Sequence, residues 1–128
     1  ILLNIAAEGS NGAYRGTILR SAAVTATGFG TGRNMGASTA GQTFAVVYRV
    51  LAVSGAGSIT LRVQESANDG APDAYADITG LTETFTAVGA VRDTVTIATE
   101  AWKRVSVQAF SGFTSVTILV TAGIVHGT

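Results

Sequence analysis

The stretch Ser58-Ile59-Thr60-Leu61-Arg62-Val63-Gln64-Glu65-Ser66 decides the fold, because apolar and polar side chains alternate along it. Successive side chains of an extended chain point to opposite faces, so this pattern predicts a half-buried antiparallel strand. Trp102–Phe110 repeats the pattern, with Val105, Val107 and Ala109 on one face. Two such stretches, far apart in the chain, indicate a sheet with one face on a core.

Two other segments, Phe44–Val53 and Ser115–Val125, are apolar on both faces. They are predicted to be central strands or strands at a subunit contact. Glycine-rich stretches, which permit tight reversals, separate the strands: Gly9-Ser10-Asn11-Gly12, Gly28-Phe29-Gly30-Thr31-Gly32, Ser54-Gly55-Ala56-Gly57 and Ser111-Gly112. No window has the spacing of an amphipathic helix.

We therefore predict an all-β fold, an antiparallel β-sandwich or jelly roll of about eight to nine strands. Residues 1–128 are expected to form one such domain, with residues 1–32 as a joining or arm segment from a longer chain. These eight to nine strands are predicted among the segments Leu2–Ala7, Tyr14–Leu19, Ala22–Ala26, Phe44–Val53, Ile59–Glu65, Ala76–Leu81, Phe85–Val88, Val91–Ala98, Trp102–Phe110 and Val116–Val125.

The composition favours association between copies. Among 128 residues there are 8 basic and 8 acidic side chains, so the formal net charge is +0 and only 12% of residues are charged. Ordinary domains carry about 25% charged residues. Weak repulsion between neutral copies favours self-assembly. Neutrality without a basic cluster argues against nucleic-acid binding. The apolar stretches are too short to span a bilayer, so no membrane role is expected.

The inventory of reactive residues predicts that the protein is not an enzyme and needs no cofactor. There is no cysteine, and His126 is the only histidine. A serine triad needs a positioned base, and zinc sites need several His or Cys ligands. Gly28, Gly30 and Gly32 resemble part of a dinucleotide fingerprint, but no helix is predicted after them.

Asp69, Asp73 and Asp77 form the one candidate metal site. Three carboxylates in one loop could supply oxygen ligands to a hard cation such as calcium. Their spacing of four residues, with Pro72 between them, differs from the alternate-residue pattern of an EF-hand loop. The alternative is that Asp69 forms the turn with Asn68, while the other two carboxylates lie in solvent. No metal is assigned on this evidence.

Trp102 is the one candidate platform for a sugar, because carbohydrate modules stack sugar rings on exposed aromatic side chains. It is the only tryptophan and begins a predicted strand. The tyrosines Tyr14, Tyr48 and Tyr75 are scattered and are predicted to pack in the core or at strand ends.

The order of motifs from Gly41 to Val125 resembles a domain of tailed-bacteriophage virion proteins. The motifs are a strand and small-residue turn, a strand ending near Q-x-S, an acidic turn, Y-A-D, a T-F-T strand and an aromatic-K/R-R-V strand. In this chain they are Tyr48–Gly55, Ile59–Ser66, Asn68-Asp69-Gly70, Tyr75-Ala76-Asp77, Thr84-Phe85-Thr86 and Trp102-Lys103-Arg104-Val105, followed by Phe113–Thr117.

The resemblance implies a structural protein of the virion, located on the tail or the capsid surface. Its expected partners are copies of itself and other virion proteins, with Arg49, Arg62 and Arg104 as interface candidates. We hypothesise that Arg49 or Arg62 pairs with a carboxylate of the next copy. A tail protein is favoured over a capsid decoration protein. The alternative from another class is a carbohydrate-binding or adhesin β-sandwich that recognises a host-surface glycan.

Overall fold

The protein is built from antiparallel β-strands. The computed structural model describes residues 13–14 and 16–126, and in this part of the chain there are eight strands and no helix. No segment of the described chain could therefore cross a membrane as a helix. The all-β, antiparallel prediction is confirmed. The strands are β1 (Ala13–Tyr14), β2 (Thr17–Val24), β3 (Gly28–Phe29), β4 (Arg33–Asn34), β5 (Thr43–Ser66), β6 (Ala76–Phe85), β7 (Gly89–Val95) and β8 (Trp102–His126).

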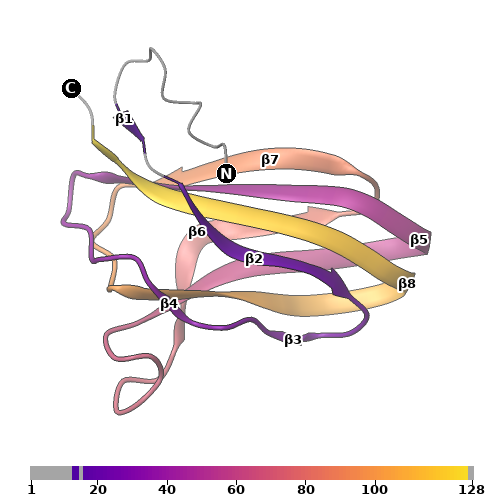
Figure 1. Ribbon diagram of the computed structural model, residues 1–128, viewed down its shortest axis with the longest axis horizontal. Coiled ribbons are helices and arrows are strands. Elements are labelled where there is room, and N and C mark those ends of the chain that lie inside the picture. Colours follow the sequence, from indigo (N-terminus) through magenta and orange to yellow (C-terminus); the bar gives the residue numbers. More distant parts are fainter. Residues whose placement is uncertain (1–12, 15, 127–128) are drawn as a thin grey trace.

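β5 and β8 form a long ribbon at the centre of the fold (Figure 1). They pair antiparallel from one end, where Thr43 lies opposite Val125, to the other, where Ser66 lies opposite Trp102. The register shifts near the middle of the ribbon, between Gly55 and Ser58. Figure 1 shows both strands turning back on themselves at the right of the view. The two-stranded ribbon therefore folds back on itself near its middle.

Glycine makes this bend sterically feasible. Gly55 and Gly112 have φ angles of 93° and 83°, in the left-handed region that glycine adopts at little cost. A Cβ on Gly57 would collide with the carbonyl oxygen of Ser111, and one on Gly112 with that of Ala56. The sequence prediction of chain reversals at these glycines was wrong. A positive φ occurs in a bend as well as in a tight turn. The four strands predicted on either side of these glycines are therefore two long, bent strands, β5 and β8.

The bend divides the sheet into two halves. The first half contains β2, β7, residues 43–53 of β5 and residues 115–125 of β8. The second half contains β3, β4, β6, residues 59–66 of β5 and residues 102–110 of β8. The two strands of the ribbon run through both halves, so hydrogen bonds join all the strands into one sheet.

Side chains of the two halves meet across a common core. The hydroxyl of Tyr48, in the first half, donates a hydrogen bond to the carbonyl oxygen of Leu81, in β6, at 2.5 Å. The ammonium nitrogen of Lys103, in the second half, lies 4.7 Å from the centre of the Phe44 ring, in the first. The sheet therefore folds over on itself. The sandwich or jelly-roll form expected from the sequence is a finer statement, and it stays a prediction.

Alternation predicted most of the buried face. Ile59, Leu61, Val63, Val105 and Val107 are all buried, as expected. Ala109 is exposed instead, because the register shifts between Thr60 and Leu61 and moves the end of the pattern to the other face. The remaining core residues are Leu19, Val24, Phe44, Val46, Tyr48, Val50, Ile78, Leu81, Phe85, Phe113, Val116, Ile118, Val120 and Ala122.

The described part of the expected arm belongs to the sheet. β2 pairs with β8 from Thr17 opposite Ala122 to Val24 opposite Val116. Leu19 lies in the same core as the ribbon. The predicted strand Leu2–Ala7 and most of the arm before β2 lie outside the described residues. From β2 onward the chain forms one folded unit around one core.

Candidate functional site

A row of hydrogen-bonded polar side chains crosses the outer face of the second half. Arg62 donates to the hydroxyl of Thr82 at 2.9 Å and forms an ion pair with Asp77. Gln64 donates its amide to the other oxygen of Asp77 at 2.9 Å. Arg104 in turn donates to the amide oxygen of Gln64 at 2.8 Å. We call these residues the polar row.

The polar row continues into an aromatic stack. The guanidinium carbon of Arg104 lies 3.9 Å from the centre of the Phe29 ring and 4.2 Å from that of Tyr75. Arg104 is therefore held by cation–π contacts as well as by Gln64. The Tyr75 hydroxyl donates to Asp69 at 2.8 Å. Partial burial and this hydrogen bond raise the pKa of Tyr75 to about 12.

The charges in the polar row are compensated within the chain. The hydrogen bond from Gln64 holds the pKa of Asp77 below its usual value, and the Arg62 guanidinium lowers it as well. Partial desolvation opposes both. The structure thus gives Arg62 and Arg104, both interface candidates, partners in their own chain. A carboxylate from another copy would have to displace those partners.

The three aspartates of the candidate metal site are not brought together. Asp69 accepts from Tyr75, Asp77 from Arg62 and Gln64, and Asp73 accepts from the backbone amide of Ala67 at 2.8 Å. Asp73 thereby closes the 66–75 loop on itself. Among the described residues, no group of three or more metal-ligating side chains converges.

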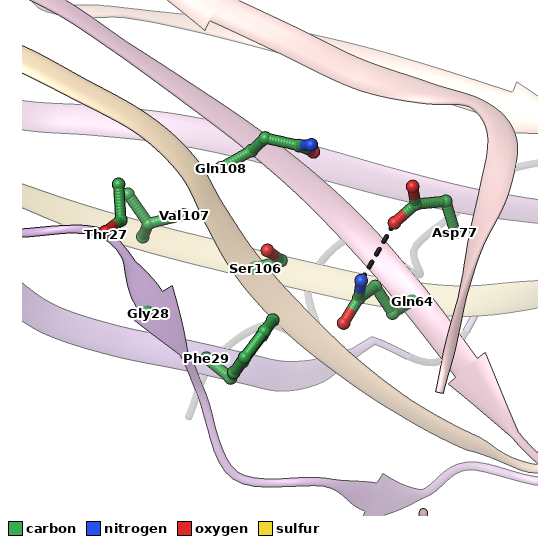
Figure 2. Close-up of a pocket in the computed structure, with 8 residues that line it drawn as sticks. All are labelled: Thr27, Gly28, Phe29, Gln64, Asp77, Ser106, Val107 and Gln108. Carbon is green, nitrogen blue, oxygen red and sulfur yellow. Dashed lines mark hydrogen bonds between the residues drawn. The ribbon is translucent and has the colours of Figure 1, made fainter. Parts of the chain in front are cut away.

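An open groove lies beside the polar row (Figure 2). Its volume is about 330 Å³. Figure 2 shows Thr27 and Phe29 on one side, Gln64 and Asp77 on the other, and Ser106 between them. The groove is lined by Thr27, Gly28, Phe29, Gln64, Asp77, Ser106, Val107 and Gln108, which come from β3, β5, β6, β8 and the residue before β3.

Trp102 does not line this groove. It is half-buried, and its backbone pairs with Asn34 of β4 on one side and Ser66 of β5 on the other. The aromatic side chain in the groove is Phe29, whose exposed fraction is 60%. Sequence reasoning interpreted Gly28–Gly32 only as a turn and missed Phe29. A large aromatic side chain isolated among glycines, with no apolar alternation around it, was the available signal.

The outer face of the first half carries two arginines that, unlike Arg62 and Arg104, are not held by other side chains of the described residues. Arg49 and Arg92 are exposed, and in the described part of the chain neither forms a hydrogen bond or ion pair. Their neighbours across the strands are small, apolar or hydroxyl-bearing. Two cross-strand rows make up this face: Ala90, Arg49, Leu119 and Ser21, and Arg92, Val47, Thr121 and Ile18. We call it the Arg49–Arg92 face.

Lys103 is fully buried at the end of the core. Its ammonium group donates to the Thr99 hydroxyl at 3.0 Å, to the Gly36 carbonyl oxygen at 3.3 Å and to the Glu100 carbonyl oxygen. Burial lowers the pKa of Lys103 to about 8, although the charges of Glu65 and Glu100 oppose the shift. All three of its protons are used in tying two loops to β8, so its role is structural.

Two carboxyl groups meet between β6 and β7. Burial, a hydrogen bond with Glu83 and the charge of Glu83 together raise the pKa of Asp93 to about 6. One oxygen of Asp93 is buried without a hydrogen-bond partner among the described residues. Each of these two acids comes from a different half of the sheet, so the pair marks where the edges of the halves approach.

Comparison with protein-family models and with curated proteins identifies no relative. No protein-family model matches the chain, and no curated protein matches it. The resemblance to virion domains therefore stays a prediction, as does the expectation that the protein is not an enzyme. Of the sole histidine, His126, the structure describes only the backbone, at the end of β8.

Proposed function

We propose that the protein is a structural component of a bacteriophage virion that assembles with copies of itself and with other virion proteins. A tail location is proposed first and capsid decoration second. The observation that carries the proposal is the Arg49–Arg92 face, which presents two exposed arginines among small and apolar side chains. Arginine is enriched at protein interfaces because its weakly hydrated head pairs with carboxylates and backbone oxygens.

The complementary charge is present elsewhere on the same chain. Carboxylates gather at the end of the second half, around the 66–75 loop and the start of β8. Desolvation and the neighbouring carboxylates of Asp73 and Glu65 raise the pKa of Glu100, which indicates local negative potential. The described carboxylates of this acidic end are Glu65, Asp69, Asp73 and Glu100. A second copy is therefore the partner that we propose for the Arg49–Arg92 face.

Such a contact is heterologous, because the surfaces that meet are different. Repeating it generates a ring if the rotation closes and a filament if it does not. Both are architectures that a virion uses. The exposed Leu51, 51% accessible, and Val88, 60% accessible, lie beside this face, where Val50 pairs with Gly89, and add apolar area to the contact.

The test is the oligomeric state measured by light scattering after size exclusion, together with negative-stain microscopy. The wild-type protein is expected to form rings, tubes or defined oligomers. The double variant Arg49→Glu with Arg92→Glu is expected to be monomeric, because two positive charges that meet an acidic surface become negative.

Thr84→Glu is the control, because it adds a negative charge at an exposed position of β6, outside both the Arg49–Arg92 face and the acidic end. It is expected to assemble like the wild type. A wild-type protein that stays monomeric at millimolar concentration would overturn the proposal. So would a double variant that is folded by circular dichroism and assembles normally.

A further inference from the structure

We propose that the groove on the outer face of the second half binds a neutral carbohydrate. Phe29 supplies the stacking surface, and Gln64, Gln108 and Asp77 supply hydrogen bonds to sugar hydroxyl groups. The proposal does not depend on self-assembly, because the groove and the Arg49–Arg92 face lie on different halves of the sheet.

The size of the groove fits a small ligand. Its volume of about 330 Å³ lies at the lower end of the range for ligand-binding sites, roughly 300 to 1,000 Å³. Ser106 of β8 lies between the two sides, which come from β3 with the residue before it and from β5 and β6 (Figure 2). Because all of these strands belong to one hydrogen-bonded sheet, the walls are held by the fold itself.

The polar lining suits a polyhydroxylated molecule. A sugar hydroxyl both donates and accepts, and a carboxamide offers both partners at once. The amide of Gln64 is fixed between Asp77 and Arg104, so it is already oriented before a ligand arrives. Gln108 is exposed at the rim. Such preorganisation lowers the entropic cost of binding.

The aromatic side of the groove suits the apolar face of a sugar ring. Phe29 is 60% exposed although it is a large apolar side chain. Arg104 lies on one face of its ring, at 3.9 Å, which orients the ring and leaves its remaining surface accessible. The C–H groups on one face of a pyranose can pack against this accessible surface of the Phe29 ring.

The charge of the groove favours a neutral ligand. Asp77 is the only charged side chain among the lining residues, and Arg62 and Gln64 compensate it. Recognition of phosphate groups depends on arginine, lysine or backbone amide donors. No arginine or lysine lines the groove. A purely apolar ligand is disfavoured as well, because most of the lining side chains are polar.

The test is an NMR titration of the ¹⁵N-labelled protein with methyl glycosides of glucose, galactose, mannose and N-acetylglucosamine. Every sample carries Arg49→Glu and Arg92→Glu, which keep the protein monomeric and leave the groove unchanged. Inorganic phosphate is titrated separately as an anionic probe. At least one glycoside is expected to give saturable shifts confined to the residues of the groove, with a Kd in the millimolar range. Phosphate is expected to give none there.

Two variants remove the proposed contacts. Phe29→Ala is expected to weaken binding about tenfold or more through loss of the stacking surface, and Gln108→Ala severalfold through loss of a hydrogen-bonding partner. Both positions are exposed, and Gln108→Ala leaves the stack on Arg104 intact should Phe29→Ala disturb the fold. Ile97→Ala is the matched control, because it removes an exposed apolar side chain outside both the groove and the Arg49–Arg92 face.

Three results would overturn the proposal. The first is the absence of saturable shifts with every glycoside. The second is wild-type affinity in both Phe29→Ala and Gln108→Ala. The third is saturable binding of phosphate, and not of glycosides, at the same residues. Because the readout is a set of chemical shifts, these results leave the oligomeric state, and with it the proposed virion role, to its own test.

Discussion

The two outer faces of the folded sheet differ in how their arginines are satisfied. On the second half, Arg62 and Arg104 are bonded to Asp77, Gln64 and two aromatic rings of their own chain. On the first half, Arg49 is exposed, and no contact of it with a charged group is seen among the described residues. A face with compensated charge suits a neutral ligand, whereas a face with uncompensated charge suits a charged partner. Arginine therefore has a different role on each of the two faces.

The largest loss of stability is expected at the bend that separates the two halves of the sheet. Gly112→Ala should lower the free energy of unfolding by about 3 kcal/mol or more, because the left-handed φ and a collision with the Ala56 carbonyl oxygen act together. Gly36→Ala is the control: its φ is +85° but nothing lies within 4 Å of the added Cβ. It should cost only about 1 kcal/mol. Urea unfolding measures both, and equal midpoints would contradict the steric argument.

A smaller change in stability is expected at Asp93, where the edges of the two halves meet. Asp93 has a pKa of about 6 in the folded protein and an ordinary value of 3.8, so the folded state binds more protons between these two pH values. Stability from this group therefore falls as the pH rises from about 4 to about 6. Asp93→Asn should stabilise the protein by about 1 kcal/mol at pH 7, since solvent partly screens the pair, and should have little effect at pH 3.

Asp77→Asn is the control with the opposite sign. The folded-state pKa of Asp77 is lowered, so its contribution is present above the ordinary pKa and is lost as the pH falls through the folded value. This variant should therefore be less stable than wild type at pH 7. Thermal melts at pH 3, 5 and 7 separate the two profiles. Two variants that shift stability in the same direction would refute the charge assignments.

The smallest effect addresses the comparison of the two faces directly. Arg62→Ala should cost about 0.5 to 1 kcal/mol, because it removes a partly exposed ion pair and a hydrogen bond to Thr82. Arg49→Ala should leave the stability of the dilute protein unchanged within about 0.5 kcal/mol. Denaturant curves at low protein concentration test the difference. A larger loss for Arg49→Ala would mean that this arginine has a role within its own chain.

Period-two alternation was sufficient to predict the fold class and most of the buried face of the ribbon in the second half of the sheet. Ile59, Leu61, Val105 and Val107 are in the core because alternate residues of a strand share a face. The same rule places Lys103 on that face, two residues before Val105. This burial was not predicted, since a lysine is seldom fully buried. Its burial depends on the Gly36 and Glu100 carbonyl oxygens, which alternation does not locate.

The candidate groove could not be predicted from the sequence. Phe29, Gln64 and Asp77 come from three strands, and only the pairing of β3 with β8 and of β5 with β6 brings them together. Arg62 and Asp77 are 15 positions apart, and nothing in their local sequence indicates that they pair. Glycine is equally ambiguous: Gly55 and Gly112 bend a ribbon, although a tight turn would need the same backbone freedom. Long-range register decides such features.

The burial of Lys103 has a practical consequence. It is the only lysine of the chain, and its side chain is fully enclosed in the folded protein. An amine-acylating reagent can reach it only when the segments around Gly36 and Glu100 separate from β8. The rate at which this one side chain is acylated therefore reports how often that end of the molecule opens, with no label or tryptophan probe introduced.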